Sequence, residues 1–302
     1  MPNDDKKISL IKRRLIESSV AIEADDPESI LYQHTVFCQT GLPYRDPGQE
    51  ALVWERLNGN VHLEVSAGKA MDPERGRLVQ LGLPWGAKPR LILAHLNAEA
   101  LRTGSPTVEV DDSLTAFVKR LRLDTGGRTM RTIKDQLARL SASRICLGIV
   151  SGGRALTINS QVVTAFDIWF PKDERQRVLW PNTVKLSHEY FESLQKHAVP
   201  LDDRSVAALS HSAMGLDIYA WLAQRLHRID PFKPQPITWA ALKSQFGWHY
   251  GQMPKFKQVF RKTLAEVQTQ YRAARIDLDD EGITLRNSPP PIKGRIGITA
   301  RR

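Results

Sequence analysis

Cationic and amide side chains gather on one face of a helix predicted over residues 253–272. At 3.6 residues per turn, the opposite face is apolar and consists of Phe256, Val259, Phe260, Leu264, Val267 and Tyr271. Arg and Lys side chains reach phosphates and guanine, and Gln can pair with adenine, so such a face suits a DNA groove. The candidate contact residues are Lys255, Lys257, Gln258, Arg261, Lys262, Thr269 and Arg272. An isolated basic helix can also be a solvated surface, so the flanking elements decide between the two interpretations.

The segments on either side of this helix favour the DNA-binding interpretation. Residues 237–246 predict a short helix that Thr238 caps and Gly247 ends. After the basic helix, residues 275–278 and 283–286 alternate like two strands around an acidic turn. This order of helix, turn, basic helix and hairpin predicts a winged helix-turn-helix. In that fold the second helix lies in the major groove and the hairpin lies against the flanking backbone.

The same order of elements is predicted in the N-terminal half of the chain. Two helices are predicted over residues 113–121 and 128–143, with Asp111 or Asp112 as the first cap, and a hairpin follows. Asp135 lies on the outward face of the second helix, so this unit either contacts DNA or mediates self-association. The candidate DNA-binding residues on that face are Arg128, Arg131, Thr132 and Arg139. The predicted fold is α+β, with two tandem winged helix-turn-helix domains.

The predicted domain organisation has four parts. Residues 1–40 form a flexible N-terminal arm, residues 41–172 the first winged-helix domain and residues 173–287 the second. Residues 288–302 form a disordered basic tail that can lie along a DNA backbone. A length of 302 residues agrees with two domains. Further helices are predicted over residues 8–24, from Pro89 onward, and over residues 188–197 and 203–228.

Charge and cysteine usage restrict the partners and the compartment. The net charge is +10 and the sequence pI is near 9.7, so nucleic acid or an anionic membrane surface are the candidate partners. No apolar run approaches the roughly 20 residues that span a bilayer, and residues 1–30 lack the apolar core of a signal peptide. Cys38 and Cys146 lie far apart in the sequence. We therefore expect a reduced, cytoplasmic protein without a membrane partner.

Catalytic motifs are absent from the sequence. It contains no Walker-type phosphate-binding loop, no paired C-x-x-C and no H-E-x-x-H. His34 and Cys38 lie one helical turn apart, but two ligands do not make a zinc site. Asp277, Asp279 and Asp280 could suggest a two-metal carboxylate set, although an acidic hairpin turn is the favoured interpretation. We expect no catalytic residue, no metal and no cofactor, and hence a protein that is not an enzyme.

Five stretches, in one order over most of residues 41–290, carry a family resemblance. They begin at Gly82, Gly126, His197, Leu216 and Pro236 and read G-L-P-W-G-A-K-P-R-L-I-L-A, G-G-R-T-M-R-T-I-K-D-Q-L-A-R-L, H-A-V-P-L-D-D-R, L-D-I-Y-A-W-L-A-Q-R-L and P-I-T-W-A-A-L-K-S-Q-F-G. In these motifs the chain resembles the plasmid-encoded RepA-type replication initiators.

This resemblance implies a function and partners. It implies sequence-specific binding to directly repeated origin DNA (iterons), help in opening the origin, and loading of host replication initiator and helicase proteins. It also implies a bacterial, plasmid-associated protein in the cytoplasm, with a homodimer as the form that does not initiate. The alternative function is a winged-helix transcriptional repressor, including repression of its own promoter. Direct repeats beside an A·T-rich stretch favour initiation, whereas a lone inverted repeat over the promoter favours a dimeric repressor.

Overall fold

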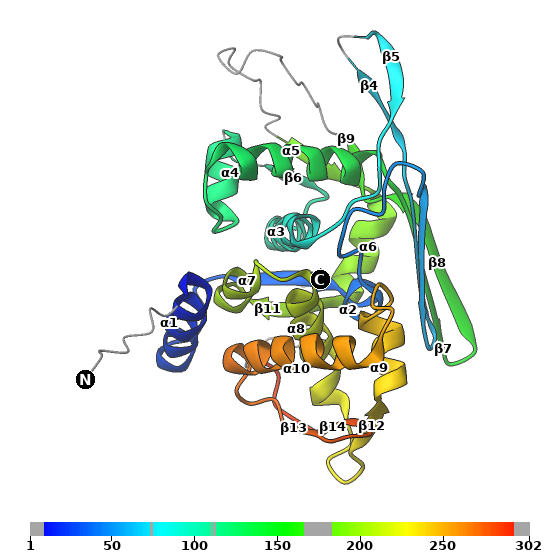
Figure 1. The fold of residues 1–302 in the computed structure, drawn as a ribbon. Helices are drawn as coiled ribbons and strands as arrows, with labels where there is room; N and C mark the ends of the chain where they lie inside the picture. The colour runs from blue at the N-terminus through cyan, green and yellow to red at the C-terminus, as the bar shows by residue number, and fades with distance from the viewer. Residues whose placement is uncertain (1–8, 73–74, 110, 112, 166–182, 293–302) are drawn as a thin grey trace. The chain divides into compact units, whose positions relative to one another are not determined.

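The computed structural model describes residues 9–72, 75–109, 111, 113–165 and 183–292 of an α+β chain (Figure 1). The described residues form two compact units. The C-terminal unit contains the residues up to Ile30 together with those from Leu201 onward, and the central unit contains Leu31–Pro200. The chain passes between the units within two strands that pair with each other, β1 (Ile30–His34) and β11 (Ala198–Asp202).

Helices build most of the C-terminal unit. The long helix α10 packs against α1, α7, α8 and α9, and the aromatic side chains of Trp221, Tyr219, Phe256 and Phe260 are buried in the core. The elements of this unit are α1 (Leu10–Ala24), α7 (Asp203–Leu209), α8 (Ala213–Arg225), the 3-10 helix η1 (Leu226–Arg228), β12 (Gln235–Thr238), α9 (Trp239–Phe246), α10 (Met253–Gln270), β13 (Ile276–Leu278) and β14 (Gly282–Leu285).

A small antiparallel sheet completes this unit, with the strand order β12-β14-β13. Its register pairs Gln235 with Leu285 and Thr238 with Gly282, so the turn between β13 and β14 lies at the Thr238 end of the sheet. A Cβ atom at Gly282 would lie 1.9 Å from the carbonyl oxygen of Ile237. This close approach requires glycine where the hairpin meets the start of α9.

The central unit combines a helical cluster with three sheets. Helix α3 contacts α5 and α6, and α5 also contacts α4. Its elements are α2 (Thr35–Thr40), β2 (Val53–Asn58), β3 (Val61–Ser66), β4 (Lys69–Asp72), β5 (Arg77–Gln80), α3 (Ala87–Thr103), β6 (Thr107–Glu109), α4 (Leu114–Arg120), α5 (Gly127–Ala142), β7 (Arg144–Ser151), β8 (Arg154–Gln161), β9 (Val163–Ala165), β10 (Thr183–Leu186) and α6 (His188–His197). The strand orders are β6-β10-β9, β2-β3-β7-β8 and β4-β5.

The two units share an order of elements when the hairpin of β7 and β8 in the central unit and the short helix η1 in the C-terminal unit are set aside. The series α3, β6, α4, α5, β9, β10 in the central unit corresponds to α8, β12, α9, α10, β13, β14 in the C-terminal unit. In both three-stranded sheets the last strand of the series lies between the other two, as the orders β6-β10-β9 and β12-β14-β13 show. Each unit therefore contains two consecutive helices and its own three-stranded antiparallel sheet, and the strand order is equivalent in the two sheets.

Several predicted elements agree with the structure. Thr238 caps α9, Gly247 follows its last residue, and Pro254 lies in the first turn of α10. Helix α6 has the predicted bounds, and α5 differs from its prediction by one residue at each end. Helix α4 is capped by the Ser113 hydroxyl, which accepts a hydrogen bond from the Ala116 backbone N–H at 3.1 Å, so the predicted cap at Asp111 is wrong. The other predicted cap, Asp112, lies outside the described residues.

The described part of the predicted flexible arm is folded. Helix α1 packs against α7 and α10, and it buries Leu15 and Ser19. The Gln270 side chain donates to the Leu15 carbonyl oxygen at 2.8 Å, and Ser18 donates to the Arg204 carbonyl oxygen at 3.1 Å. The structure differs from the predicted flexible arm, because residues 9–30 belong to the C-terminal unit and residues 31–40 to the central unit. Helix α1 gains its contacts from residues near the other end of the sequence.

The domain boundaries also differ from the prediction. Strand β10 and helix α6 lie after residue 173 but belong to the central unit, which ends at Pro200. The sequence pattern predicts a hairpin with strands over residues 144–150 and 155–170. Strands β7 and β8 form this hairpin, and β7 also pairs with β3. Residues 166–170 lie outside the described part.

Residues 288–292, predicted as the start of a disordered tail, are folded in the structure. The Ser288 hydroxyl accepts a hydrogen bond from the Arg275 backbone N–H at 2.9 Å, and the Tyr271 hydroxyl donates to the Pro289 carbonyl oxygen at 2.7 Å. Ser288 and Ile292 are buried, so residues 288–292 belong to the C-terminal unit. Residues 293–302 lie outside the described residues.

Candidate nucleic-acid interface

Helix α10 is held in place by an aromatic core along its apolar face. Phe256 and Phe260 are fully buried, and their ring centroids lie 6.3 and 5.8 Å from that of Trp239 in α9. Phe246 lies 5.7 Å from Phe260. A Cβ atom at Gly247 would lie 2.4 Å from the Phe256 ring, so glycine is needed where α9 turns into α10. The predicted apolar face is confirmed as core, except that Val259 is half-buried.

The outward face of α10 carries an exposed polar stripe. At 100° per residue, Lys255, Gln258, Lys262 and Thr269 share this stripe, and all four are exposed. The Lys255 ammonium donates to the Gln258 amide oxygen at 3.1 Å, within one turn of the helix. Two ammonium groups and an amide are therefore accessible to a DNA duplex, and contact with them would not disturb the buried core.

Two other predicted contact residues, Lys257 and Arg261, are held by neighbouring elements. Both cations lie over the Trp239 ring, each 5.2 Å from its centroid. The Lys257 ammonium donates to the Asp280 carbonyl oxygen and Arg261 donates to the Asp279 carbonyl oxygen, both at 3.2 Å. Both side chains therefore bridge α10 and the β13–β14 turn.

Arg272, the last predicted residue of this set, lies just beyond the end of α10. It forms an ion pair with Glu23 of α1. Tyr271 beside it is buried, which raises the pKa of its hydroxyl, so this group remains a hydrogen-bond donor. The end of α10 is thus engaged with α1 and with residues 288–292, and the accessible stripe lies along the rest of the helix.

Helix α5 of the central unit carries the second predicted set. The Asp124 carboxylate accepts hydrogen bonds from the Thr129 hydroxyl at 2.9 Å and the Gly126 backbone N–H at 3.1 Å, which lowers its pKa. This arrangement places a negative charge at the N-terminus of the helix. Arg128 and Arg131 on α5 are exposed.

Two other members of this second set are less accessible. Thr132 is half-buried, and its hydroxyl donates to the Arg128 carbonyl oxygen at 2.9 Å. The Arg139 guanidinium donates to Asp135 and to the Leu83 carbonyl oxygen, both at 3.1 Å. Its side chain is 18% exposed, so Arg139 ties α5 to the segment before α3. The exposed cations of the predicted α5 set are consequently Arg128 and Arg131.

The sequence did not reveal Trp239 as a platform for cations. Its side chain is 3% exposed, and its indole N–H donates to the Asp279 carbonyl oxygen at 3.3 Å. From the sequence, Trp239 is expected only to share a helix face with Leu242 and Phe246, and the structure packs its ring edge-to-face with Phe256 and Phe260. That Lys257 and Arg261 lie over the ring depends on how α9 and α10 pack, which no local pattern encodes.

The described residues contain neither a cluster of metal ligands nor a membrane-spanning helix. No group of three or more His, Cys, Asp or Glu side chains is arranged to hold a metal ion among them. None of the helices in the described ranges is long and apolar enough to cross a bilayer. The polar stripe of α10 is therefore the best-defined candidate surface in the part of the chain that the structure describes.

Comparison of the chain with known proteins identifies one family and two similar solved structures. Residues 83–241 match the family model described as plasmid encoded RepA protein. No curated protein matches the chain. A crystal structure of domains 2 and 3 of RctB is similar, with a TM-score of 0.50 and 9% identity over 84% of this chain and 98% of that chain. A second structure of RctB domains 2–3 has a TM-score of 0.45 and 10% identity, over 88% and 94% of the two chains.

Proposed function

The chain belongs to the family of plasmid-encoded RepA proteins, and on this premise we propose that it initiates replication by binding directly repeated origin DNA. The binding elements in this proposal are two winged helix-turn-helix folds. In the C-terminal unit, α10 enters the major groove and the β13–β14 turn lies against the adjacent backbone. In the central unit, α5 occupies the corresponding position in the series of elements.

The main support for this proposal is that α10 has two distinct faces. Buried aromatic rings hold its apolar face in the core, so the helix already has a fixed position in the free protein. Its other face presents Lys255, Gln258, Lys262 and Thr269 to solvent. Preorganised helices of this kind place side chains at base edges with little loss of conformational entropy.

The two types of side chain on the stripe have different tasks in this proposal. Lysine carries a point charge that suits phosphate oxygens, and its contacts do not distinguish sequences. The Gln258 amide can donate to and accept from the edge of adenine, which distinguishes one base pair from the others. Lys262 therefore contributes to affinity for any duplex, and Gln258 to the choice of site.

The role that we propose is one of binding and assembly in the cytoplasm, without catalysis by this chain. Opening of the origin then depends on distortion by bound protein, on supercoiling and on host replication initiator and helicase proteins. We propose a homodimer as the form that does not initiate. The structure of the chain supports the DNA-binding step most directly, so the experiment addresses that step.

The test measures fluorescence anisotropy of a labelled duplex that carries the repeats beside the gene. Lys262→Ala should weaken binding to all duplexes alike and reduce the slope of log K against log salt by about one unit. Gln258→Ala should weaken binding to the repeat by about 1–3 kcal/mol and leave non-specific duplexes unaffected.

Lys233→Ala is the matched control. Lys233 is exposed in the same unit, but it precedes Gln235, which the register places at the end of the sheet away from the β13–β14 turn. Its removal should leave both affinity and salt slope unchanged. Equal behaviour of the Lys262 and Lys233 variants would refute the assignment of α10. A footprint confined to an inverted repeat over the promoter would favour the repressor instead.

A further inference from the structure

Three aspartates on the β13–β14 hairpin have different partners. Asp277 pairs with Arg286, its carboxylate accepting from the guanidinium at 2.6 Å. The Asp279 carboxylate accepts from the backbone N–H groups of Glu281 and Gly282, both at 2.8 Å, and so holds the turn. The Asp280 carboxylate is fully exposed and lies 3.7 Å from the Arg261 guanidinium. The Asp280 carboxylate therefore interacts with α10 and does not stabilise the hairpin itself.

Arg261 is positioned independently of the Asp280 carboxylate. Its guanidinium lies over the Trp239 ring and donates to the Asp279 carbonyl oxygen. Lys257 is placed in the same way, over the same ring and at the Asp280 carbonyl oxygen. Removal of the Asp280 carboxylate would thus leave both cations in place. It would also uncover one positive charge beside the exposed stripe of α10.

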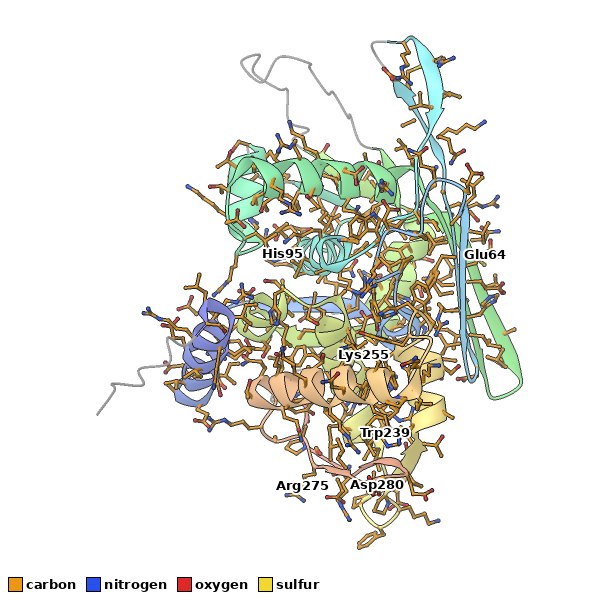
Figure 2. The ribbon with its side chains drawn as sticks, in the orientation of Figure 1. Glu64, His95, Trp239, Lys255, Arg275 and Asp280 are labelled. Carbon is orange, nitrogen blue, oxygen red and sulfur yellow. The ribbon has the colours of Figure 1, made fainter. Side chains whose placement is uncertain are left out.

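We propose that the Asp280 carboxylate occupies, in the free protein, the position that a DNA phosphate takes at Arg261, and that DNA displaces it on binding. This inference rests on the proposed function of α10. An exposed ion pair is weak and screened by salt, so a strong ligand can replace it. A phosphate is such a ligand for a guanidinium, because it accepts two N–H groups at once. Figure 2 shows Trp239 and Asp280 on neighbouring elements of the C-terminal unit.

This competition makes Asp280 a determinant of affinity. Binding must break the contact with Arg261 and move a carboxylate away from an approaching polyanion. Asp280→Asn removes both costs and keeps the size of the side chain. The gain should require Arg261, because the released guanidinium is what receives the phosphate. A long-range effect of net charge would not require it.

The experiment is a double-mutant cycle in DNA affinity. Wild type, Asp280→Asn, Arg261→Gln and the double variant are titrated against the repeat duplex by fluorescence anisotropy, at several salt concentrations. In the wild-type background, Asp280→Asn should tighten binding about threefold, the scale of one exposed ion pair. In the Arg261→Gln background the same substitution should change nothing.

Asp277→Asn is the matched control, since it removes an identical charge from the same hairpin. It should give no gain that depends on Arg261. An equal gain from Asp280→Asn with and without Arg261 would overturn the proposal in favour of a general charge effect. Weaker binding of the repeat by Asp280→Asn would overturn it too, because the carboxylate would then contact a base.

The outcome is separable from that of the proposed function. If Lys262→Ala weakens binding but the cycle shows no coupling, α10 binds DNA and the inference about Asp280 is wrong. If neither Lys262 nor Arg261 affects binding, both proposals fail. Because the substituted side chains lie at the surface of the unit, the variants should remain folded, and melting curves serve as the check on folding.

Discussion

His34 should make the central unit sensitive to mild acid. Its ring is fully buried between β1 and α2. The Val36 backbone N–H donates to Nδ1 at 3.2 Å, so Nδ1 carries no proton, and Nε2 donates to the Ser193 hydroxyl at 2.9 Å. Protonation would place a hydrogen on Nδ1 against the N–H of Val36. Burial, with a smaller effect of nearby His197, lowers the pKa of His34 to about 3.

The sign and size of the effect follow from linkage. An unfolded histidine has a pKa of about 6.5, so the unfolded chain binds a proton below that pH while the folded chain does not. The stability that depends on neutral His34 is complete above pH 6.5 and is lost as the pH falls towards 3. A pH of 5 lies about 1.5 units below the pKa of an unfolded histidine, and each unit corresponds to about 1.4 kcal/mol. The free energy of unfolding is therefore about 2 kcal/mol lower at pH 5.

The perturbation that isolates this effect is His34→Asn. Asparagine is a good N-cap and can accept from Val36, but it does not titrate. Urea unfolding is measured at pH 7 and pH 5, with hydrogen exchange of residues 35–40 and 188–197 as the local readout. Wild type should lose about 2 kcal/mol more than the variant between the two pH values.

His188→Asn supplies the control, because the His188 side chain is 74% exposed. It should lose as much stability as wild type. The variant at position 34 will start from a lower stability at pH 7, since it lacks the ring packing, so the pH difference is the quantity compared. Equal losses in wild type and His34→Asn would refute the argument that the folded protein keeps this ring neutral.

Two further predictions concern α10 and the assembly on DNA. Phe260→Ala should lower the free energy of unfolding by about 3–5 kcal/mol, because the ring is fully buried among Trp239, Phe246 and Phe256. Thermal unfolding checks this, with Lys262→Ala as the surface control, and equal melting curves would contradict it. Origin opening should need several bound copies, because unstacking ten steps costs about 14 kcal/mol and one specific site offers only about 4–10. Permanganate reactivity of the A·T-rich stretch should therefore rise steeply with repeat number on supercoiled DNA, and full opening on one repeat without host proteins would disprove it.

The sequence predicted best what neighbouring residues determine. The cap at Thr238, the end of α9 at Gly247 and the apolar face of α10 are all encoded within a few residues of where they act. The same holds for α6, which Ser187 caps with a hydrogen bond from the Tyr190 backbone N–H at 3.2 Å. Local patterns of this kind survive packing because packing reinforces them.

The sequence failed where strands find distant partners. The three-stranded sheet of the central unit pairs Val108 with Val184, and no local signal specifies that partner. The sequence pattern predicts the hairpin of β7 and β8, but it does not predict the pairing of β7 with β3. A hairpin pattern indicates that two strands are adjacent and does not identify the next strand in the sheet.

The assignment of α1 shows why a truncation is a poor test of this protein. The order of a helix, a strand and a second helix occurs as α1, β1, α2 and again as α6, β11, α7. Yet α1 packs against α7 and α10 of the C-terminal unit, while α6 packs against α3 of the central unit, where Tyr190 donates to Asn97 at 3.1 Å.

A cut at the predicted boundary after residue 172 would therefore separate α1 from the rest of the C-terminal unit. It would also separate β10 and α6 from the rest of the central unit. It would uncover the α7 and α10 surfaces that contact α1, as well as the face of α3 that contacts α6. Loss of DNA binding by such a fragment would follow from lost packing as readily as from lost contacts to DNA. Substitutions of exposed side chains in the full chain separate these two causes, because they change the surface charge and leave both helices in their units.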